Sequence, residues 1–198
     1  MTARVQRNFE FLSGVYVENE LYLNSYEIEM NFIVETDNIY EQNIALDRIK
    51  YFFIEKLDNA IFVSDEETEC IDKLSALDFK CIALPEEPYD QIIGIMLMVK
   101  TNAISEERLT VSDIRITSRM SDGVSYLHSM EESLGPFVTK GWWKDSSPTT
   151  SSNKSKNRKV VKLKEAKLSW DDLGLSWVPS KKELFSDVVV EFESKTEK

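Results

Sequence analysis

The chain has 198 residues, of which 42% are hydrophobic and 30% charged, and its formal net charge is −11 at pH 7. This balance fits one globular domain with a tail, and the negative charge argues against non-specific nucleic-acid binding over the whole surface. No apolar run reaches the 18 residues of a membrane span, and the N-terminal stretch MTARVQRNFEF lacks the apolar centre of a secretion signal. We therefore expect a cytoplasmic protein without a membrane partner.

A long antiparallel hairpin is predicted at the start of the chain. Apolar residues recur at mostly even spacing through residues 8–21, with Gly14 marking a bulge or bend. The stretches ENE (18–20) and LNS (23–25) have the composition of turns. The next strand would place one apolar face toward the core, made of Tyr26, Ile28, Met30, Phe32 and Val34.

Helical patterns follow this hairpin. Asn38 and Glu41 have the spacing of a capping box, and apolar residues then recur every three or four positions between residues 44 and 62. A short helix is predicted over residues 66–77. The apolar run 88–104 fits a buried helix or a central strand, and its length together with its opening proline favours the helix.

A second hairpin closes the predicted body. Residues 109–116 alternate with one shift of phase, which indicates a bulged strand, and the turn Ser121-Asp122-Gly123 leads into a partner strand over residues 123–129. The order strand, strand, helices, strand, strand is typical of an α+β fold. We expect two antiparallel β-hairpins that flank helices packed on one face of the sheet.

The composition changes after residue 144. Residues 145–159 are rich in serine, threonine and basic residues and contain no large apolar side chain, which predicts a flexible linker. Residues 160–198 regain apolar residues but are too few for a second core, so they would form a tail with short docking elements. The predicted division is a body over residues 1–144, the linker and this tail.

The tail contains two candidate docking elements for a protein partner. Trp170, Leu173 and Trp177 have the spacing of a short helix that docks into a groove, either on a partner or on the chain's own body. Leu184 and Phe185 form the apolar pair of KKELF, which faintly resembles peptides that bind bacterial sliding clamps, although Lys181 replaces their opening glutamine. Gly141-Trp142-Trp143 is a further candidate for an interface or for a patch that seals the body.

Residues 154–167 form a basic arm, with seven basic residues and one acidic residue in a chain of net charge −11. Such an arm could contact nucleic-acid phosphates, or it could lie on the acidic body or on a neighbouring subunit. We favour the second interpretation, because the arm lacks aromatic residues that would read bases.

Few residues suggest catalysis. The sequence has no P-loop, no glycine-rich dinucleotide turn and no CxxC pair. His128 could activate Cys70 or Cys81 as a nucleophile only if the fold brought them together, and free cysteines with a structural histidine are the simpler interpretation. The acidic stretches 65–67 and 86–87 are expected to be solvated loops.

Three segments resemble one enzyme family. They are LYLNSYEIEMNFIVET (21–36), IALDRIKYFFIEKLDNAIFV (44–63) and DIRITSRMSDGVSYL (113–127). Their order and short motifs are similar to the family of 6-pyruvoyl-tetrahydropterin synthase and 6-carboxytetrahydropterin synthase, which has the tunnelling fold. The resemblance covers roughly residues 8–128, and it implies two hairpins with two helices between them and subunits that join edge to edge into a barrel.

The same resemblance argues against the family's chemistry. Its zinc-binding histidines fall on Ser13, Tyr22 and Asn24, its proton-relay histidine on Asn59, its pterin-anchoring glutamate near Ser118 and its cysteine near Glu18. A hydroxyl, a phenol and an amide cannot replace three imidazole ligands of zinc, and an amide cannot act as a general base. We expect no bound metal, no cofactor and no catalytic residue of this family.

The leading hypothesis is therefore a non-catalytic protein that forms a homo-oligomer through its sheet edges and binds a protein partner through its tail. A phage-encoded protein of virion or replication assembly, located in the virion or the host cytoplasm, would fit this description. Two alternatives remain at the level of sequence. One is a divergent enzyme acting on a pterin or purine-like ligand, and the other is a nucleic-acid adaptor that uses the basic arm 154–167.

Overall fold

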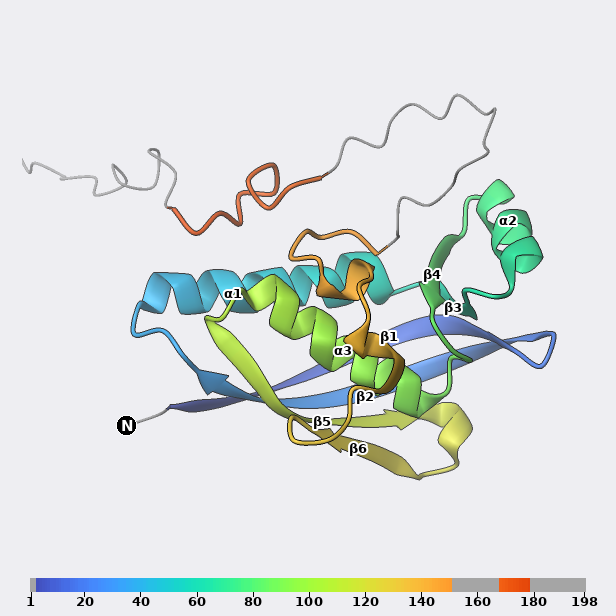
Figure 1. The fold of residues 1–198 in the computed structure, drawn as a ribbon, viewed down its shortest axis with the longest axis horizontal. Coiled ribbons are helices and arrows are strands. Elements are labelled where there is room, and N and C mark those ends of the chain that lie inside the picture. The colour runs from blue at the N-terminus through green and yellow to red at the C-terminus, as the bar shows by residue number, and fades with distance from the viewer. Residues whose placement is uncertain (1–2, 151–167, 179–198) are drawn as a thin grey trace, which may run out of the picture.

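The computed structural model describes residues 3–150 and 168–178, which form one six-stranded sheet with helices on one face (Figure 1). The strand order is β4-β3-β1-β2-β5-β6. The strands are β1 (Arg4–Val17), β2 (Glu20–Val34), β3 (Ala60–Ser64), β4 (Lys80–Leu84), β5 (Leu109–Ser118) and β6 (Ser125–Ser129). The helices are α1 (Ile39–Tyr51), the π-helix η1 (Phe52–Leu57), α2 (Thr68–Ala76), α3 (Asp90–Ser105) and the 3-10 turns η2 (Arg119–Ser121), η3 (Gly135–Val138) and η4 (Trp142–Lys144).

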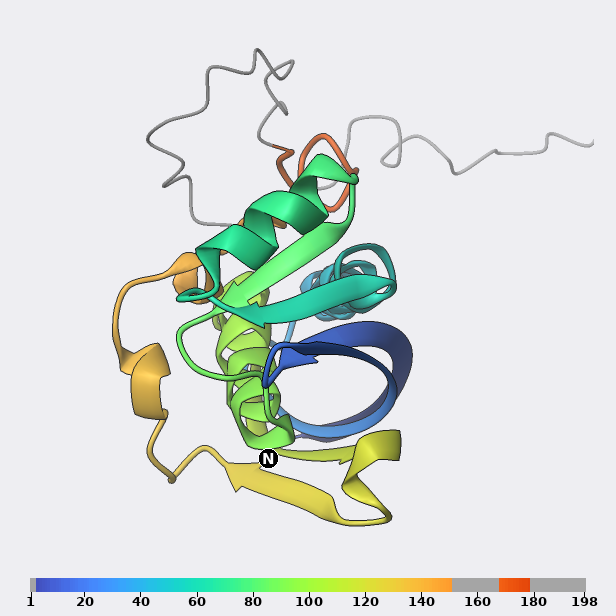
Figure 2. The ribbon, with the colours of Figure 1, turned by 90° about the vertical axis from the view of Figure 1, so that its right-hand side faces the viewer.

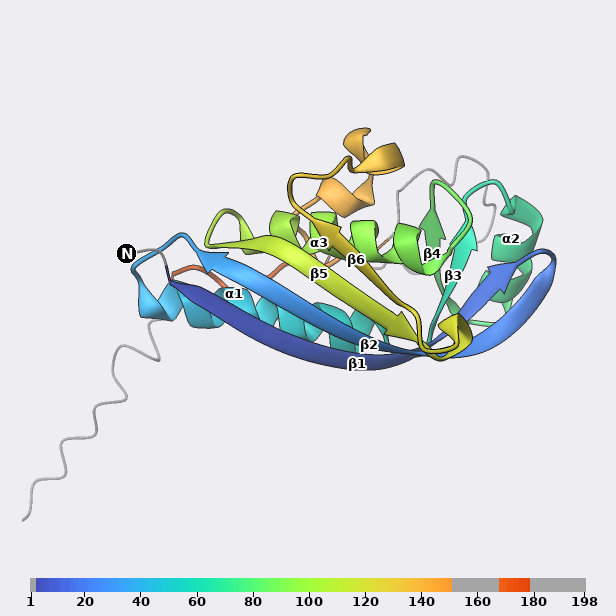
Figure 3. The same cartoon turned by 90° about the horizontal axis from the view of Figure 1, so that it is seen from below.

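The predicted α+β class is confirmed. Helices α1 and α3 lie side by side on one face of the sheet, and no described element covers the opposite face (Figures 1 and 3). In the described part of the chain, no helix is long and apolar enough to cross a membrane.

The first hairpin is longer and tighter than predicted. β1 and β2 pair without interruption from Arg4 opposite Ile33 to Val17 opposite Glu20. Only Glu18 and Asn19 form the loop, with φ of 53° and 63°, as expected for a two-residue hairpin turn. The predicted turn at residues 23–25 is therefore wrong, because these residues already belong to β2.

Gly14 does not mark a bulge, because its pairing with Leu23 keeps the regular register. Its role is close approach: a Cβ at this position would lie 3.0 Å from Ile61 Cγ1 and 3.2 Å from Leu21 Cδ1. Gly14 thus lets β3 come up to β1.

The helix predicted over residues 44–62 is too long. Its capping is confirmed, since the Asn38 side chain accepts a hydrogen bond from the Tyr40 amide. The helical stretch ends at Leu57, and Asn59 adopts a φ of 58°, a conformation that asparagine tolerates better than most residues. Residues 60–64 instead form the fully buried strand β3, parallel to β1. The sequence pattern predicted neither β3 nor β4 as a strand.

The segment with the ambiguous apolar run is a helix, as predicted. Residues Ile92–Thr101 of α3 are buried all round, because α3 lies between the sheet and the segment that carries η3 and η4 (Figure 1). The bulged strand predicted in the second hairpin is β5. Its pairing with β2 shifts register after Asn31 and leaves Ser112 as the extra residue. The predicted short helix is α2, and its side chains are half-buried or exposed.

The body extends past the boundary predicted at residue 144. Lys100 is fully buried on α3, and its ammonium donates to the carbonyl oxygens of Trp142, Asp145 and Ser147 at 3.2, 2.6 and 2.9 Å. The start of the predicted linker is therefore packed on the body. Leu184, Phe185 and the basic arm 154–167 lie outside the described residues.

Candidate functional site

Five positions were aligned with the zinc ligands, the proton-relay residue and the pterin anchor of the enzyme family. Three of these five positions come together in the fold. Ser13 and Asn24 are direct partners across β1 and β2, and Ser118 on β5 pairs with Tyr26 on β2. All three are at most 4% exposed. The Asn24 side-chain oxygen accepts from the amides of Ser25 and Met120 at 3.0 and 3.2 Å, which ties the first hairpin to the turn after β5.

The other two positions lie apart. Tyr22 precedes Asn24 by two residues on the same face of β2 and donates its hydroxyl to Glu20 at 2.5 Å. Asn59 is exposed and contacts the neighbouring Asp58 carboxylate. Neither side chain forms a hydrogen bond with the buried trio, so the five positions do not meet in a single site.

Asp90 joins the buried trio, although sequence reasoning missed it. It is the first residue of α3, and its carboxylate accepts a 2.7 Å hydrogen bond from the Ser118 hydroxyl. Burial raises the pKa of Asp90, and the bond from Ser118 opposes that rise. An acidic residue directly after Pro88 and Tyr89, at the start of a predicted helix, was the available signal.

Tyr26 closes this cluster. Its ring is 1% exposed, and its hydroxyl forms no hydrogen bond with any described residue; the same is true of the Ser13 hydroxyl. Burial raises the pKa of Tyr26, the Asp90 charge raises it further, and the nearby side chains of Asn24 and Ser13 oppose the rise. At neutral pH the phenol is therefore neutral, and the cluster offers a buried hydrogen-bond donor but no exposed base or nucleophile.

No group of three or more histidine, cysteine, aspartate or glutamate side chains converges within the described ranges 3–150 and 168–178 in a way that could hold a metal ion. Ser13, Tyr22 and Asn24, which the sequence resemblance aligns with zinc ligands, supply one hydroxyl, one phenol and one amide, a poor donor set for zinc. The described residues thus show a buried polar cluster of Ser13, Asn24, Ser118 and Asp90.

No family model matches the sequence, and no curated protein is similar to it at a significant level. Solved structures do match. The chain resembles 6-pyruvoyl tetrahydropterin synthase in structure. For the enzyme of Plasmodium vivax the identity is 10%, the TM-score is 0.41, and the match covers 65% of this chain and 97% of that one.

A second match is the uncharacterized protein WS1659 of Wolinella succinogenes, with 11% identity, a TM-score of 0.50, and coverage of 66% of this chain and 99% of that one. At such identities the similarity is one of fold alone. The predicted resemblance is thereby confirmed as a shared architecture.

The topology of the sheet excludes a pairing of His128 with Cys81. Cys81 lies on β4 and His128 on β6, at opposite ends of the six-stranded sheet. At about 4.8 Å per strand, five strand spacings separate these strands by roughly 24 Å. Cys70 and Cys81 are free, half-buried thiols, and His128 Nδ1 lies 3.1 Å from the Glu132 carboxylate.

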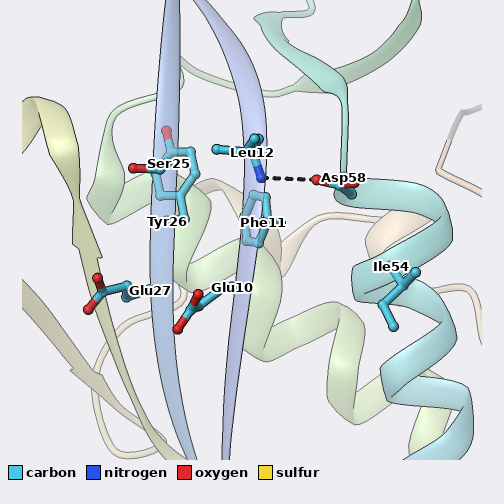
Figure 4. Close-up of a pocket in the computed structure, with 8 residues that line it drawn as sticks. All are labelled: Glu10, Phe11, Leu12, Ser25, Tyr26, Glu27, Ile54 and Asp58. Atoms are coloured by element: carbon cyan, nitrogen blue, oxygen red, sulfur yellow. Dashed lines mark hydrogen bonds between the residues drawn. The ribbon is translucent and has the colours of Figure 1, made fainter.

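A groove of about 360 Å³ runs beside β1 (Figure 4). Its lining residues come from β1, β2 and the π-helix: Glu10, Phe11, Leu12, Ser25, Tyr26, Glu27, Ile54 and Asp58. The Asp58 carboxylate accepts the Leu12 amide at 3.0 Å, and the Asn59 amide donates to the Leu12 carbonyl at 2.8 Å. Both backbone groups of Leu12 therefore point away from β2.

The tail returns to the body at residues 168–178, which we call the strap (Figure 2). It forms turns rather than the short helix that the spacing of its tryptophans suggested. Trp170 is 6% exposed, while Leu173 and Trp177 are partly buried against the core. Of the alternatives left open by the sequence, packing on the chain's own body is the arrangement found in this structure.

Arg48 of α1 is the centre of this contact. Its guanidinium lies 4.9 Å from the ring centre of Trp170 and 3.7 Å from that of Trp177. It also donates to the Leu175 carbonyl at 2.8 Å and pairs with the Glu106 carboxylate at 2.9 Å. Burial lowers the pKa of Arg48, and the contact with Glu106 opposes this effect, so the arginine remains a cation.

Proposed function

We propose that this chain is a non-catalytic assembly protein whose subunits join through the free edges of their sheets. The observation that carries the proposal is the edge of β1. β3 pairs with β1 only at Ser13–Val15, so no described strand lies beside residues 4–12 on the side away from β2.

The backbone of this edge is directed outward at every second residue. Leu12 points both of its backbone groups away from β2, and a strand repeats every two residues. Gln6, Asn8 and Glu10 therefore present their amides and carbonyls in the same outward direction. Their side chains are exposed, so the edge is open to an added strand.

The sheet also has an edge on the far side of β2 and β5 from β1. β6 is the last strand, and exposed apolar side chains accompany it: Val124 (68%), Leu127 (56%) and Met130 (50%). Two open edges on one sheet permit subunits to extend the sheet from one copy to the next.

The buried polar cluster supports the non-catalytic part of the proposal. Ser13, Asn24 and Ser118 offer no donor set for zinc, and the one carboxylate of the cluster, Asp90, is held by the Ser118 hydroxyl. A polar cluster of this kind links strands and turn, as Asn24 does between β2 and Met120.

The test replaces one outward-facing amide. Asn8→Pro removes an amide that the β1–β2 pairing does not use, and proline is tolerated on an edge strand with its nitrogen toward solvent. Asn8→Ala is the matched control because it keeps the amide. We expect wild type and Asn8→Ala to be oligomers by light scattering and Asn8→Pro to be monomeric with little change in thermal stability.

Two results would reject the proposal. One is a monomeric wild type across the accessible concentration range. The other is an Asn8→Pro variant that is folded and keeps the mass of the wild-type oligomer, because the β1 edge would then have no part in assembly.

A further inference from the structure

We propose that the body carries a docking site for the strap that is exchangeable between copies, so that the strap of a second copy of this chain occupies it in the assembly. The site is formed by Arg48, Tyr51, Glu106 and Arg108 on one end of the helical layer. Its ligand is an acidic peptide with two tryptophans, and its sequence in this chain is LSWDDLGLSWV.

The site is built by the body and not by its ligand. Glu106 pairs with Arg48 at 2.9 Å, and Glu41 pairs with Arg108 at 3.0 Å, so both guanidinium groups are oriented by neighbours from their own body. Arg48 also lies within 3.5 Å of the Ile104 carbonyl at the end of α3. Two planar cations held in this way offer flat faces on which an indole ring can stack.

The strap fits these groups with specific contacts. The Trp177 ring lies over Arg48 and also over Arg108, at 3.7 and 4.4 Å, while its indole nitrogen donates to Glu106 at 3.0 Å. Trp170 packs edge-on against Tyr51 with ring centres 5.9 Å apart. Its indole nitrogen donates to the Ser146 carbonyl at 2.5 Å.

The contact is suited to reversible binding. Trp170 is the one described strap residue that is buried, Leu173, Leu175 and Trp177 are partly buried against the core, and the other contacts are cation–π contacts and hydrogen bonds. Several of these bonds use strap backbone, as when Arg48 binds the Leu175 carbonyl and Tyr40 donates to the Ser176 carbonyl at 3.3 Å. Such contacts resemble those by which proteins bind short peptides, rather than those of a permanent core.

Exchange follows from the connection between strap and body. Seventeen residues, 151–167, separate the two described parts of the chain. The site would form the same contacts with its own strap and with the strap of a neighbouring copy. The local concentration of each strap therefore decides which one is bound. A short tether gives a local concentration in the millimolar range, and neighbouring copies in an assembly reach similar values.

The experiment uses complementary full-length variants. Trp170→Ala/Trp177→Ala leaves the site intact but removes the anchors of the strap, while Arg48→Ala keeps the strap and damages the site. Both carry Asn8→Pro, so that pairing of β1 edges does not contribute to the measured masses. If the edge proposal is wrong, Asn8→Pro does not change the oligomeric mass, and this experiment still measures binding of the strap alone.

We expect the two variants to form a 1:1 heterodimer in native mass spectrometry when mixed, and neither to dimerise alone. A fluorescent peptide of residues 168–178 should bind Trp170→Ala/Trp177→Ala at least tenfold more tightly than wild type, whose site is filled by its own strap. Adding Arg48→Ala or Arg108→Ala to that variant should abolish peptide binding, and Arg108, whose side chain is half-exposed where Arg48 is buried, guards against a failure to fold.

Three results would overturn the inference. The first is the absence of a heterodimer although both variants are folded by circular dichroism. The second is equal peptide binding with and without Arg48 and Arg108. The third is equal binding of a scrambled peptide of the same composition, because the site would then recognise charge and not the strap.

Discussion

Lys100 provides a sharp test of the packing of the C-terminal part of the body. Its ammonium is fully buried and is bound by three carbonyl oxygens of residues 142–147. Burial lowers the pKa of Lys100 from its usual 10.5 to about 7, and the Asp145 charge opposes this change in part. We predict that this lysine makes the stability of the protein depend on pH.

The sign follows from proton binding. Between pH 7 and 10.5 the unfolded state holds the proton on Lys100 while the folded state has released it, so the free energy of unfolding rises with pH. Each pH unit in this window contributes about 1.4 kcal/mol, hence about 3 kcal/mol between pH 7 and 9. Below pH 7 both states bind the proton, and the full penalty of burying the charge is present.

The measurement compares wild type with Lys100→Met in urea unfolding followed by tryptophan fluorescence, at several pH values from 6.5 to 9. Methionine retains the length of the side chain and leaves the three carbonyls without a donor, a loss that does not depend on pH. Lys144→Met, which removes an exposed lysine from the same segment, is the control for the loss of one positive charge.

The wild-type stability should rise by about 3 kcal/mol relative to Lys100→Met from pH 7 to pH 9. A difference that stays constant over this range would refute the reasoning. In that case the three carbonyls hold the ammonium strongly enough to outweigh burial.

Three further predictions concern single side chains. Gly14→Val should destabilise the protein by about 1–3 kcal/mol, because the valine side chain would clash with Ile61. Gly94→Ala should instead stabilise the protein by up to about 1 kcal/mol, because alanine is the better helix former. Urea unfolding of both variants measures these changes, and equal effects would contradict the roles assigned to the two glycines. Burial lowers the pKa of His128, so stability should fall as the pH drops below about 6.5 and this loss should be smaller in His128→Leu; identical pH profiles would show that His128 does not contribute. Tyr26→Phe should leave stability unchanged or raise it by about 1 kcal/mol in thermal unfolding, because the phenol has no partner among the described residues, and a clear loss of stability would reveal a partner such as a buried water.

The local sequence pattern was sufficient for elements that bury one face against the core. The alternation from Tyr26 to Phe32 predicted the buried face of β2, and the phase shift within residues 109–116 predicted a bulged strand, whose extra residue the structure places at Ser112. The capping asparagine Asn38 was also identified correctly. In these cases neighbouring residues carry the whole signal.

Local pattern failed where distant segments compete. Residues 60–64 continue a helical period, yet they form β3 because β1 and β4 offer two strands with which to pair. The groups around Arg48 could not be predicted, since the strap lies far from α1 in the chain: the Arg48–Leu175 hydrogen bond spans 127 positions. Asp90 joined the polar cluster only through its bond to Ser118, which lies 28 residues further along the chain.

The sequence by itself determined the fold class, the two hairpins and the residue types at Ser13, Tyr22, Asn24, Asn59 and Ser118, because periodicity and side-chain chemistry are local properties. Only the tertiary structure decided which of those positions meet, which edge of β1 stays open and where the strap binds. Pairing between strands and docking of a segment depend on backbone groups and surfaces contributed by residues far apart in the chain. No local pattern encodes that proximity, and it follows only once the chain has folded.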